Sequence, residues 1–224
     1  MRQLVTTTYL EMTDRTCFRP SQPSAVEFQL VRVELPCPEL NRFLYAAVGA
    51  DWCWYSRLAW DYAQWLAYLD RPELETWVAY VAGTPAGYYE LERQSCGDVE
   101  IKYFGVMPGF IGKGIGGALL SEAIARAWEM DAGRVWVHTC TLDHPQACRN
   151  YQARGFEIFK TEEGFEELPD HPLEPWPSAG RPRAQQGHGA DGLTPAAHGR
   201  RVCRAWPRAR EVKVLLPGVR RAEG

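Results

Sequence analysis

Short segments in which apolar and polar residues alternate, or in which β-branched and aromatic residues run together, recur along the chain. A period of two places alternate side chains on opposite faces of a sheet, so these segments are predicted to be β-strands. The predicted strands are residues 4–13, 25–34, 76–82, 86–94, 98–107, 134–140 and 155–162. Only short turns, Gly83-Thr84-Pro85 and Cys96-Gly97, separate the third, fourth and fifth strands, which predicts an antiparallel meander.

Other segments place apolar residues three or four positions apart, the spacing that forms one face of a helix. The clearest of these has a predicted buried stripe of Leu119, Leu120, Ala123, Ile124, Ala127 and Trp128. The predicted helices are residues 38–48, a segment around 60–68 that Pro72 ends, 114–131 and 144–154. This order of strands and helices predicts an α/β sheet that mixes antiparallel with parallel pairing.

Charge and composition divide the chain into a body and a tail. Residues 172–224 hold ten Lys and Arg against four Asp and Glu, although the whole chain has a net charge of −3. Because the tail is rich in Gly, Ala, Pro and Arg and has no apolar period, residues 169–224 are predicted to be disordered or poorly packed, apart from a short strand at 211–219. The body, residues 1–168, is predicted to form one domain, and its acidic balance argues against a nucleic-acid partner.

The composition also argues against several other classes of protein. No run of eighteen apolar residues is present and the first residues lack the apolar core of a signal peptide, so we expect no membrane partner. The seven cysteines follow no regular spacing, which favours the reducing cytoplasm over a disulfide framework. Because no paired Cys and His ligands occur, we expect no metal cofactor.

Residues 108–120, PGFIGKGIGGALL, concentrate five glycines directly before the predicted long helix. Glycine is costly to order, so this density predicts a backbone that comes very close to a ligand. The N-terminus of a helix offers unpaired N–H groups and the positive end of the helix dipole. We therefore expect this loop to bind phosphate groups.

Two familiar phosphate-binding motifs fit the loop poorly. The GxxxxGK[ST] motif fails twice, because Met107 replaces its first glycine and Gly114 replaces its Ser or Thr. The dinucleotide motif GxGxxG is matched literally by Gly112, Gly114 and Gly117, but the preceding strand ends too early, near Val106. The next strand also lacks the acidic residue that would bind a ribose. Dinucleotide binding therefore remains a weaker alternative.

A third interpretation joins the loop to its neighbours. The pattern V-x-P-x-x-x-G-x-G-x-G is formed by Val106, Pro108, Gly112, Gly114 and Gly116, and about thirty-five residues later Y-x-x-x-G-F is formed by Tyr151, Gly155 and Phe156. Together these motifs resemble the GNAT superfamily of acyl-CoA-dependent N-acyltransferases. The resemblance is good over residues 76–163 and coarse over 1–75. It departs from the family where Ile111 replaces the usual Arg or Gln and His144 stands near the place of a frequent Asn.

The resemblance implies a mixed, mostly antiparallel twisted sheet that is flanked by helices and splayed at the cofactor site. It also implies acetyl-CoA as cosubstrate, with the pyrophosphate on the loop amides and the pantetheine arm along the strand before the loop. The cofactor-binding residues that it implies are Phe104, Gly105, Val106, Ile111, Gly112, Lys113, Gly114, Ile115, Gly116 and Gly117.

The resemblance further implies transfer of an acetyl group to a primary amine within a ternary complex. An amine with a pKa of about 10.4 arrives protonated and needs a base, for which the family position is Glu100. An ordinary outward-facing strand carboxylate is an equally good interpretation of Glu100. Tyr151 matches the family's acid for the leaving thiolate, with packing at a helix–sheet seam as its alternative. His138 is expected to pack within its strand rather than act as a base.

The acceptor is the least defined part of the prediction. Six aromatic residues gather in one short segment, and they either wall an apolar or cation-binding pocket or belong to the core: Trp52, Trp54, Tyr55, Trp60, Tyr62 and Trp65. The predicted function is an N-acetyltransferase for a small-molecule or peptide amine, and the alternative is a non-catalytic acyl-CoA-binding module. A homodimer is left open.

Overall fold

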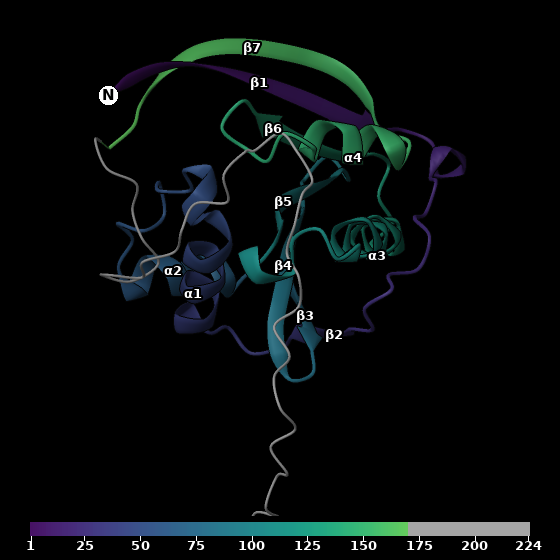
Figure 1. The fold of residues 1–224 in the computed structure, drawn as a ribbon, viewed down its shortest axis with the longest axis horizontal. Coiled ribbons are helices and arrows are strands. Elements are labelled where there is room, and N and C mark those ends of the chain that lie inside the picture. Colours follow the sequence, from purple (N-terminus) through teal and green to yellow (C-terminus); the bar gives the residue numbers. More distant parts are fainter. Residues whose placement is uncertain (170–224) are drawn as a thin grey trace, which may run out of the picture. The chain divides into compact units, whose positions relative to one another are not determined.

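The structure is a computed structural model that describes residues 1–169. Its sheet has seven strands in the order β2-β3-β4-β5-β6-β1-β7 (Figure 1). The strands are β1 (Arg2–Met12), β2 (Gln29–Val33), β3 (Leu74–Val81), β4 (Thr84–Arg93), β5 (Val99–Val106), β6 (Val135–Cys140) and β7 (Glu157–Glu167). Nearly all of the predicted tail, including its strand at 211–219, lies outside the described residues.

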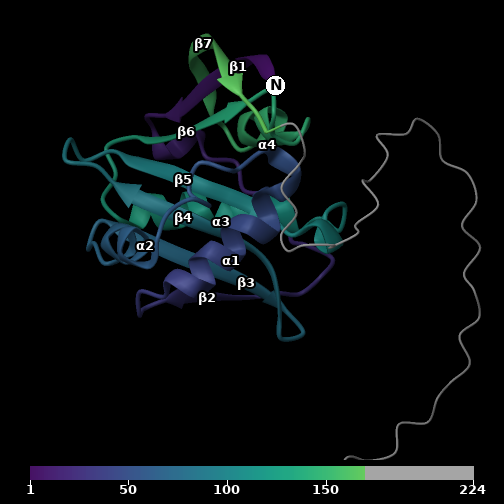
Figure 2. The same cartoon turned by 90° about the vertical axis from the view of Figure 1, so that its left-hand side faces the viewer.

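Helices cover both faces of this sheet. They are α1 (Pro38–Gly49), α2 (Tyr62–Leu69), α3 (Ile115–Glu129) and α4 (Ala147–Ala153). Helices α1 and α2 lie on one face, while α3 packs on the other (Figure 2). Helix α2 starts at a capping box, in which the Asp61 carboxylate accepts from the Gln64 N–H and the Gln64 side chain accepts from the Asp61 N–H.

The predicted fold class is confirmed. Five of the six strand pairings are antiparallel, and only β5 and β6 run parallel. The predicted meander corresponds to β3, β4 and β5. The predicted stripe of α3 is buried in the main core apart from Trp128, which is partly exposed. Each fully buried leucine in such a core contributes about 1.5–3 kcal/mol to stability, so α3 is firmly held on the sheet.

The position of β1 was not predicted. This first strand lies between β6 and β7, so Thr7 pairs with Cys140 on one side and with Glu162 on the other. The chain then crosses the α3 face to reach β2 at the opposite end of the sheet, and on the way the Ser21 N–H donates to Ser121 Oγ at 2.9 Å. Alternation of residue types indicates a strand but not its partners, which are chosen by tertiary packing.

The two parallel strands separate soon after they meet. They pair only at Val99 with Val135 and at Glu100 with Trp136, although both strands continue for several residues. On its other side β5 stays paired with β4, with a bulge opposite Glu90 and Leu91. The sheet therefore opens between β5 and β6, and the backbone edge of β5 that faces the opening has no neighbouring strand among the residues that the structure describes.

Candidate active site

A cavity of about 630 Å³ lies where β5 and β6 separate. Six of the ten predicted cofactor-binding residues line it: Phe104, Gly105, Val106, Ile111, Gly112 and Gly116. The other four, Lys113, Gly114, Ile115 and Gly117, are outside its lining. The structure thus brings the strand before the loop, the loop and the start of α3 together around one space.

Two glycines of the loop adopt a backbone conformation that other residues rarely take. Gly112 has φ +81° and Gly114 has φ +80°, both in the left-handed region that favours glycine. A Cβ added at Gly112 would meet no atom within 4 Å, so the loop faces open space there. Gly114 precedes α3 and no side chain caps the helix. The first N–H groups of α3 are therefore available to an anion.

At three other glycines, the absence of a side chain allows close packing. A Cβ at Gly117 would lie 3.2 Å from Arg154 Nη1, so this glycine permits close packing of a side chain. A Cβ at Gly105 would overlap Val48 of α1, and one at Gly155, where φ is +103°, would overlap the carbonyl oxygen of Cys17. These positions hold the sheet, α1 and the segment after β1 together around the cavity.

Tyr151 of α4 lines the cavity and is buried, with 6% of the residue exposed. Its ring contacts those of Phe104 and Phe156, at centroid distances of 6.3 and 6.1 Å. Burial, and to a smaller extent the nearby charge of Asp143, raises the pKa of Tyr151 well above its usual value. The phenol therefore keeps its proton at neutral pH and remains a hydrogen-bond donor. Its role as an acid stays a prediction.

Glu100 is not the outward-facing carboxylate that was one interpretation of the sequence, because only 1% of it is exposed. Oε2 accepts from Lys102 Nζ at 2.9 Å and from Gln94 Nε2 at 3.3 Å. Oε1 makes no hydrogen bond, and His138 Nδ1 lies 3.5 Å from it. Burial alone would raise the pKa of Glu100, but His138 and Lys102 outweigh it and lower the pKa. Its role as a base stays a prediction.

The expectation that His138 packs within its strand is wrong. Its side chain is 44% exposed and lines the cavity on β6, beside the opening. The ring lies near those of Tyr9 and Trp136, at centroid distances of 5.8 and 6.2 Å. The signal was present in the segment VWVHTC, because alternation places Trp136 and His138 on the face opposite the buried Val135 and Val137.

The six aromatic residues after α1 were predicted either to wall a pocket or to belong to the core, and the structure contains both kinds. Trp52 and Trp54 line the cavity together with Tyr45 and Tyr103, whereas Trp65 is buried in the core and Tyr62 is exposed. These four cavity residues form an aromatic wall on the side of the cavity where α1 and α2 lie. Asp143, which also lines the cavity, accepts from Thr139 Oγ1 at 2.8 Å and from the Cys140 N–H at 2.9 Å.

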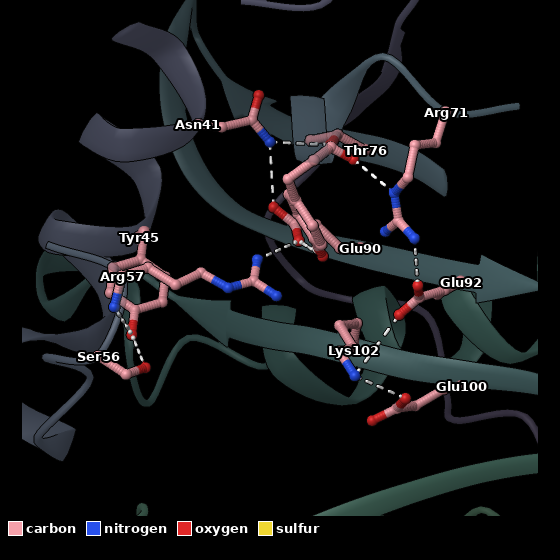
Figure 3. A network of polar contacts seen from close by, with 11 residues as sticks. Asn41, Tyr45, Ser56, Arg57, Arg71, Thr76, Glu90, Glu92, Glu100 and Lys102 are labelled. Carbon is pink, nitrogen blue, oxygen red and sulfur yellow. Dashed lines mark hydrogen bonds and ion pairs between the residues drawn. The ribbon is translucent and has the colours of Figure 1, made fainter. Parts of the chain in front are cut away.

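A buried polar network supports this wall and was missed in the sequence (Figure 3). Arg57 Nη1 lies 3.4 Å from Glu90 Oε2, and its guanidinium packs over the rings of Trp60, Tyr68 and Tyr103. Glu90 also accepts from Tyr68 at 2.7 Å. A buried ion pair is costly unless it is fully hydrogen-bonded, so this set of contacts fixes the segment that carries Trp52 and Trp54.

Two other features that could indicate a function in the described part of the chain are a metal-binding cluster and a membrane-spanning helix. Among residues 1–169, no group of three His, Cys, Asp or Glu side chains is arranged to hold a metal ion. The same residues include no helix with the length and apolar character that crossing a membrane requires. Six cysteines in this range have free thiols.

Comparison with known proteins identifies the family. The model of the Acetyltransferase (GNAT) family matches residues 36–156. Uncharacterized N-acetyltransferases of Mycobacterium tuberculosis and Mycobacterium bovis are 32% identical over 96 residues, which are 43% of this chain and 61% of theirs. The match thus spans less than two thirds of these relatives.

Solved structures show the same fold. A GCN5-related N-acetyltransferase from Kribbella flavida superposes with a TM-score of 0.52 at 16% identity, over 73% of this chain and 58% of that chain. One from Sphaerobacter thermophilus gives 0.52 at 17% identity, over 76% and 54%. The match of the family model over more than half of the sequence, together with this fold, shows that the chain belongs to the GNAT family of acetyltransferases.

Proposed function

We propose that the protein transfers an acetyl group from acetyl-CoA to a primary amine by direct attack within a ternary complex. One observation carries this proposal: a single cavity joins the uncapped, glycine-rich start of α3 to the opening between β5 and β6. Such a space suits a ligand with a phosphate group at one end and an extended arm along a strand. Membership of the GNAT family supports the choice of an acyl-CoA.

The phosphate end is proposed to use main-chain groups. The N–H groups of residues 112–116 would surround the pyrophosphate, because Gly112 and Gly114 let the loop curl without side chains in the way. The exposed Lys113 adds a positive charge nearby but is not needed to form the cradle. Binding energy at this end therefore comes from backbone dipoles and from the dipole of α3.

The strand end is proposed to hold the reacting group. Beyond Glu100 no strand within residues 1–169 pairs with the β6-facing edge of β5, so backbone groups of Phe104, Gly105 and Val106 are available to an extended arm. An N–H group in this stretch would stabilise negative charge that develops on the thioester oxygen. The thioester supplies the activated acetyl group, and the protein aligns it with the amine.

Two proton transfers accompany the reaction. The departing thiolate is proposed to take a proton from Tyr151, whose phenol stays protonated in its buried position. The amine must lose a proton before or during its attack, and Glu100 is proposed to supply the negative charge that this transfer needs. Because Glu100 is buried, its effect on the amine has to pass through a neighbouring side chain.

The acceptor is proposed to lie against the aromatic wall of the cavity. Trp52, Trp54 and Tyr103 present ring faces and edges that suit an apolar or cationic group beside the reacting amine. A small-molecule or peptide amine fits such a wall. The free thiols of the described cysteines agree with the proposed cytoplasmic location.

The test is a transfer assay with acetyl-CoA and a panel of small-molecule and peptide amines. We expect release of free thiol that depends on the amine, together with an acetylated product seen by mass spectrometry. Thiol release without any amine measures hydrolysis and is the control. Tight acetyl-CoA binding with no transfer across the whole panel would contradict the proposal and favour an acyl-CoA-binding module.

A further inference from the structure

We propose that His138 takes the proton from the attacking amine, and that Glu100 acts behind it as a positioning residue. This inference rests on the proposed acetyltransferase function and assigns the base of that reaction. It differs from the sequence prediction, in which Glu100 itself was the base and His138 had no part. The placement of the two side chains relative to the cavity leads to the change.

Glu100 is poorly placed to touch an amine. Its side chain is 2% exposed and does not line the cavity. One carboxylate oxygen is occupied, because Oε2 accepts from Lys102 and Gln94. The other oxygen, Oε1, is a buried acceptor without a hydrogen bond, and the nitrogen facing it is Nδ1 of His138 at 3.5 Å. A buried carboxylate oxygen left without a donor is costly, so it favours a proton on that nitrogen.

His138 has the access that Glu100 lacks. It lines the cavity, and in sequence it comes two residues after Trp136, which makes the last pair between β6 and β5. It therefore lies where the two strands begin to separate. When Nδ1 faces a carboxylate and carries a proton, the neutral imidazole has its lone pair on Nε2, the nitrogen that can accept a further proton. No hydrogen bond to Nε2 is present among residues 1–169.

The groups around His138 leave room for a positive charge on its ring. Lys102 also faces Glu100, but its ammonium lies 2.9 Å from that carboxylate and 3.5 Å from Glu92 (Figure 3). Other charged or titratable groups near the ring or lining the same cavity come from β1, β5, β6, β7, α1, α4 and the segments after α1 and β6. They are Tyr9 with its partners Lys160 and Glu162, together with Tyr45, Cys53, Tyr103, Cys140, Asp143, His144, Arg149, Tyr151 and Glu166. The three carboxylates of this set outnumber its lysine and its arginine, Lys160 and Arg149.

With a neutral amine, the reaction forms one C–N bond and breaks one C–S bond. The nitrogen bonds to the thioester carbonyl carbon, and one N–H proton moves to Nε2 of His138 while Nδ1–H donates to Glu100, which stays ionised. The C–S bond then breaks with its electron pair on sulfur, and the thiolate takes a proton from Tyr151. Return of the His138 proton to the tyrosinate, directly or through water, restores the enzyme. One proton leaves nitrogen and one reaches sulfur.

The test compares pH profiles of kcat and of kcat/KM for the amine in four proteins. These are the wild type, His138→Asn, Glu100→Gln and the control Glu75→Gln. Glu75 is also a buried, ion-paired strand glutamate, but it contacts Arg126 of α3 on the other face of the sheet. His138→Gln serves as a second variant if His138→Asn fails to fold, and CoA affinity verifies an intact cofactor site.

We expect His138→Asn to lower kcat about 100-fold, the lower end of the range for general base catalysis, and to leave CoA affinity unchanged. Wild-type activity should fall at acid pH, where an imidazole is protonated, and this fall should be absent in His138→Asn. Glu100→Gln should keep this fall, because His138 and its imidazole are still present in that variant. Free imidazole should restore part of the rate to His138→Gly, which a purely structural role would not allow.

The test distinguishes a failure of this inference from a failure of the proposed acetyltransferase function. If wild type is active and His138→Asn keeps its rate and its acidic fall in activity, the role of His138 is overturned while the acetyltransferase function stands. If Glu100→Gln alone removes the acidic fall, Glu100 is the direct base and the inference is again overturned. If wild type binds acetyl-CoA but acetylates no amine, the proposed function fails and the inference fails with it.

Discussion

The two ends of the cavity are built in different ways. The end that is proposed to bind the phosphates, called the phosphate end, is lined from one continuous segment by Val106, residues 110–112 and Gly116, and the shape of this segment depends on Gly112 and Gly114. The end that is proposed to bind the amine, called the acceptor end, is lined by side chains from α1, the segment after it, β5, β6 and β7. His138 and Glu100 are thirty-eight positions apart in sequence and meet only because β5 and β6 run side by side.

This difference has consequences for how each end tolerates change. A site made of backbone N–H groups is insensitive to most side-chain substitutions, but it fails when a residue alters the path of the chain. A site made of side chains fails residue by residue, and each loss affects one step of the reaction. Substitutions at the two ends should therefore separate cofactor affinity from turnover and from acceptor binding.

The largest effect is expected from Gly112→Asp, which breaks the phosphate end. The side chain strains a backbone with φ +81° and places a negative charge where the pyrophosphate is proposed to bind. We expect CoA affinity to fall about 100-fold, or about 2.7 kcal/mol, by calorimetry. Gly133→Asp, in open space beyond the other end of α3, is the control. Equal losses in the two variants would contradict the backbone site.

Tyr151→Phe tests the middle of the cavity, between the phosphate end and the acceptor end, where the thioester is proposed to react. Removing the hydroxyl removes the proposed proton donor but keeps the ring contacts with Phe104 and Phe156. We expect kcat to fall about 30-fold with unchanged CoA affinity, because a thiolate with a pKa of about 8.5 leaves without a strong acid. Stopped-flow or steady-state assays measure this. An unchanged kcat would remove Tyr151 from the mechanism.

Trp52→Ala tests the acceptor end. This residue lines the cavity, and its ring packs edge-on against His144, so its loss opens the aromatic wall without disturbing the loop before α3. We expect KM for a good acceptor to rise about 10-fold, which corresponds to one lost aromatic contact. CoA affinity should not change. A weakened CoA complex with an unaltered KM for the amine would reverse the assignment of the two ends.

The smallest effect is expected from Lys113→Ala, which removes a side-chain charge near the phosphate end. The ammonium is exposed and lies 5.0 Å from the Phe110 ring centroid, so it adds only a solvent-screened charge to the phosphate end. We expect CoA affinity to fall about 2-fold, with a larger fall at low salt than at high salt. A loss comparable to that of Gly112→Asp would mean that a side chain, and not the backbone, binds the phosphates.

The sequence predicts the phosphate end of the cavity better than the acceptor end. The strands, the stripe of α3 and the glycine loop follow from local patterns, because periodicity and backbone freedom are local properties. The alternation in VWVHTC also places His138 opposite the buried Val135 and Val137. Local patterns do not reveal which strands become neighbours. The pairing of β1 between β6 and β7, the burial of Glu100 and its approach to His138 were therefore not foreseen.

An NMR titration of the backbone amides with CoA and, separately, with pantetheine tests directly whether main-chain groups bind the phosphates. If main-chain N–H groups of residues 112–116 hold the pyrophosphate, CoA should shift their resonances strongly and pantetheine should leave them nearly unchanged. Pantetheine should instead shift residues of β5 near Gly105. Saturation of the protein with CoA while the amides of 112–116 stay in place would contradict the account.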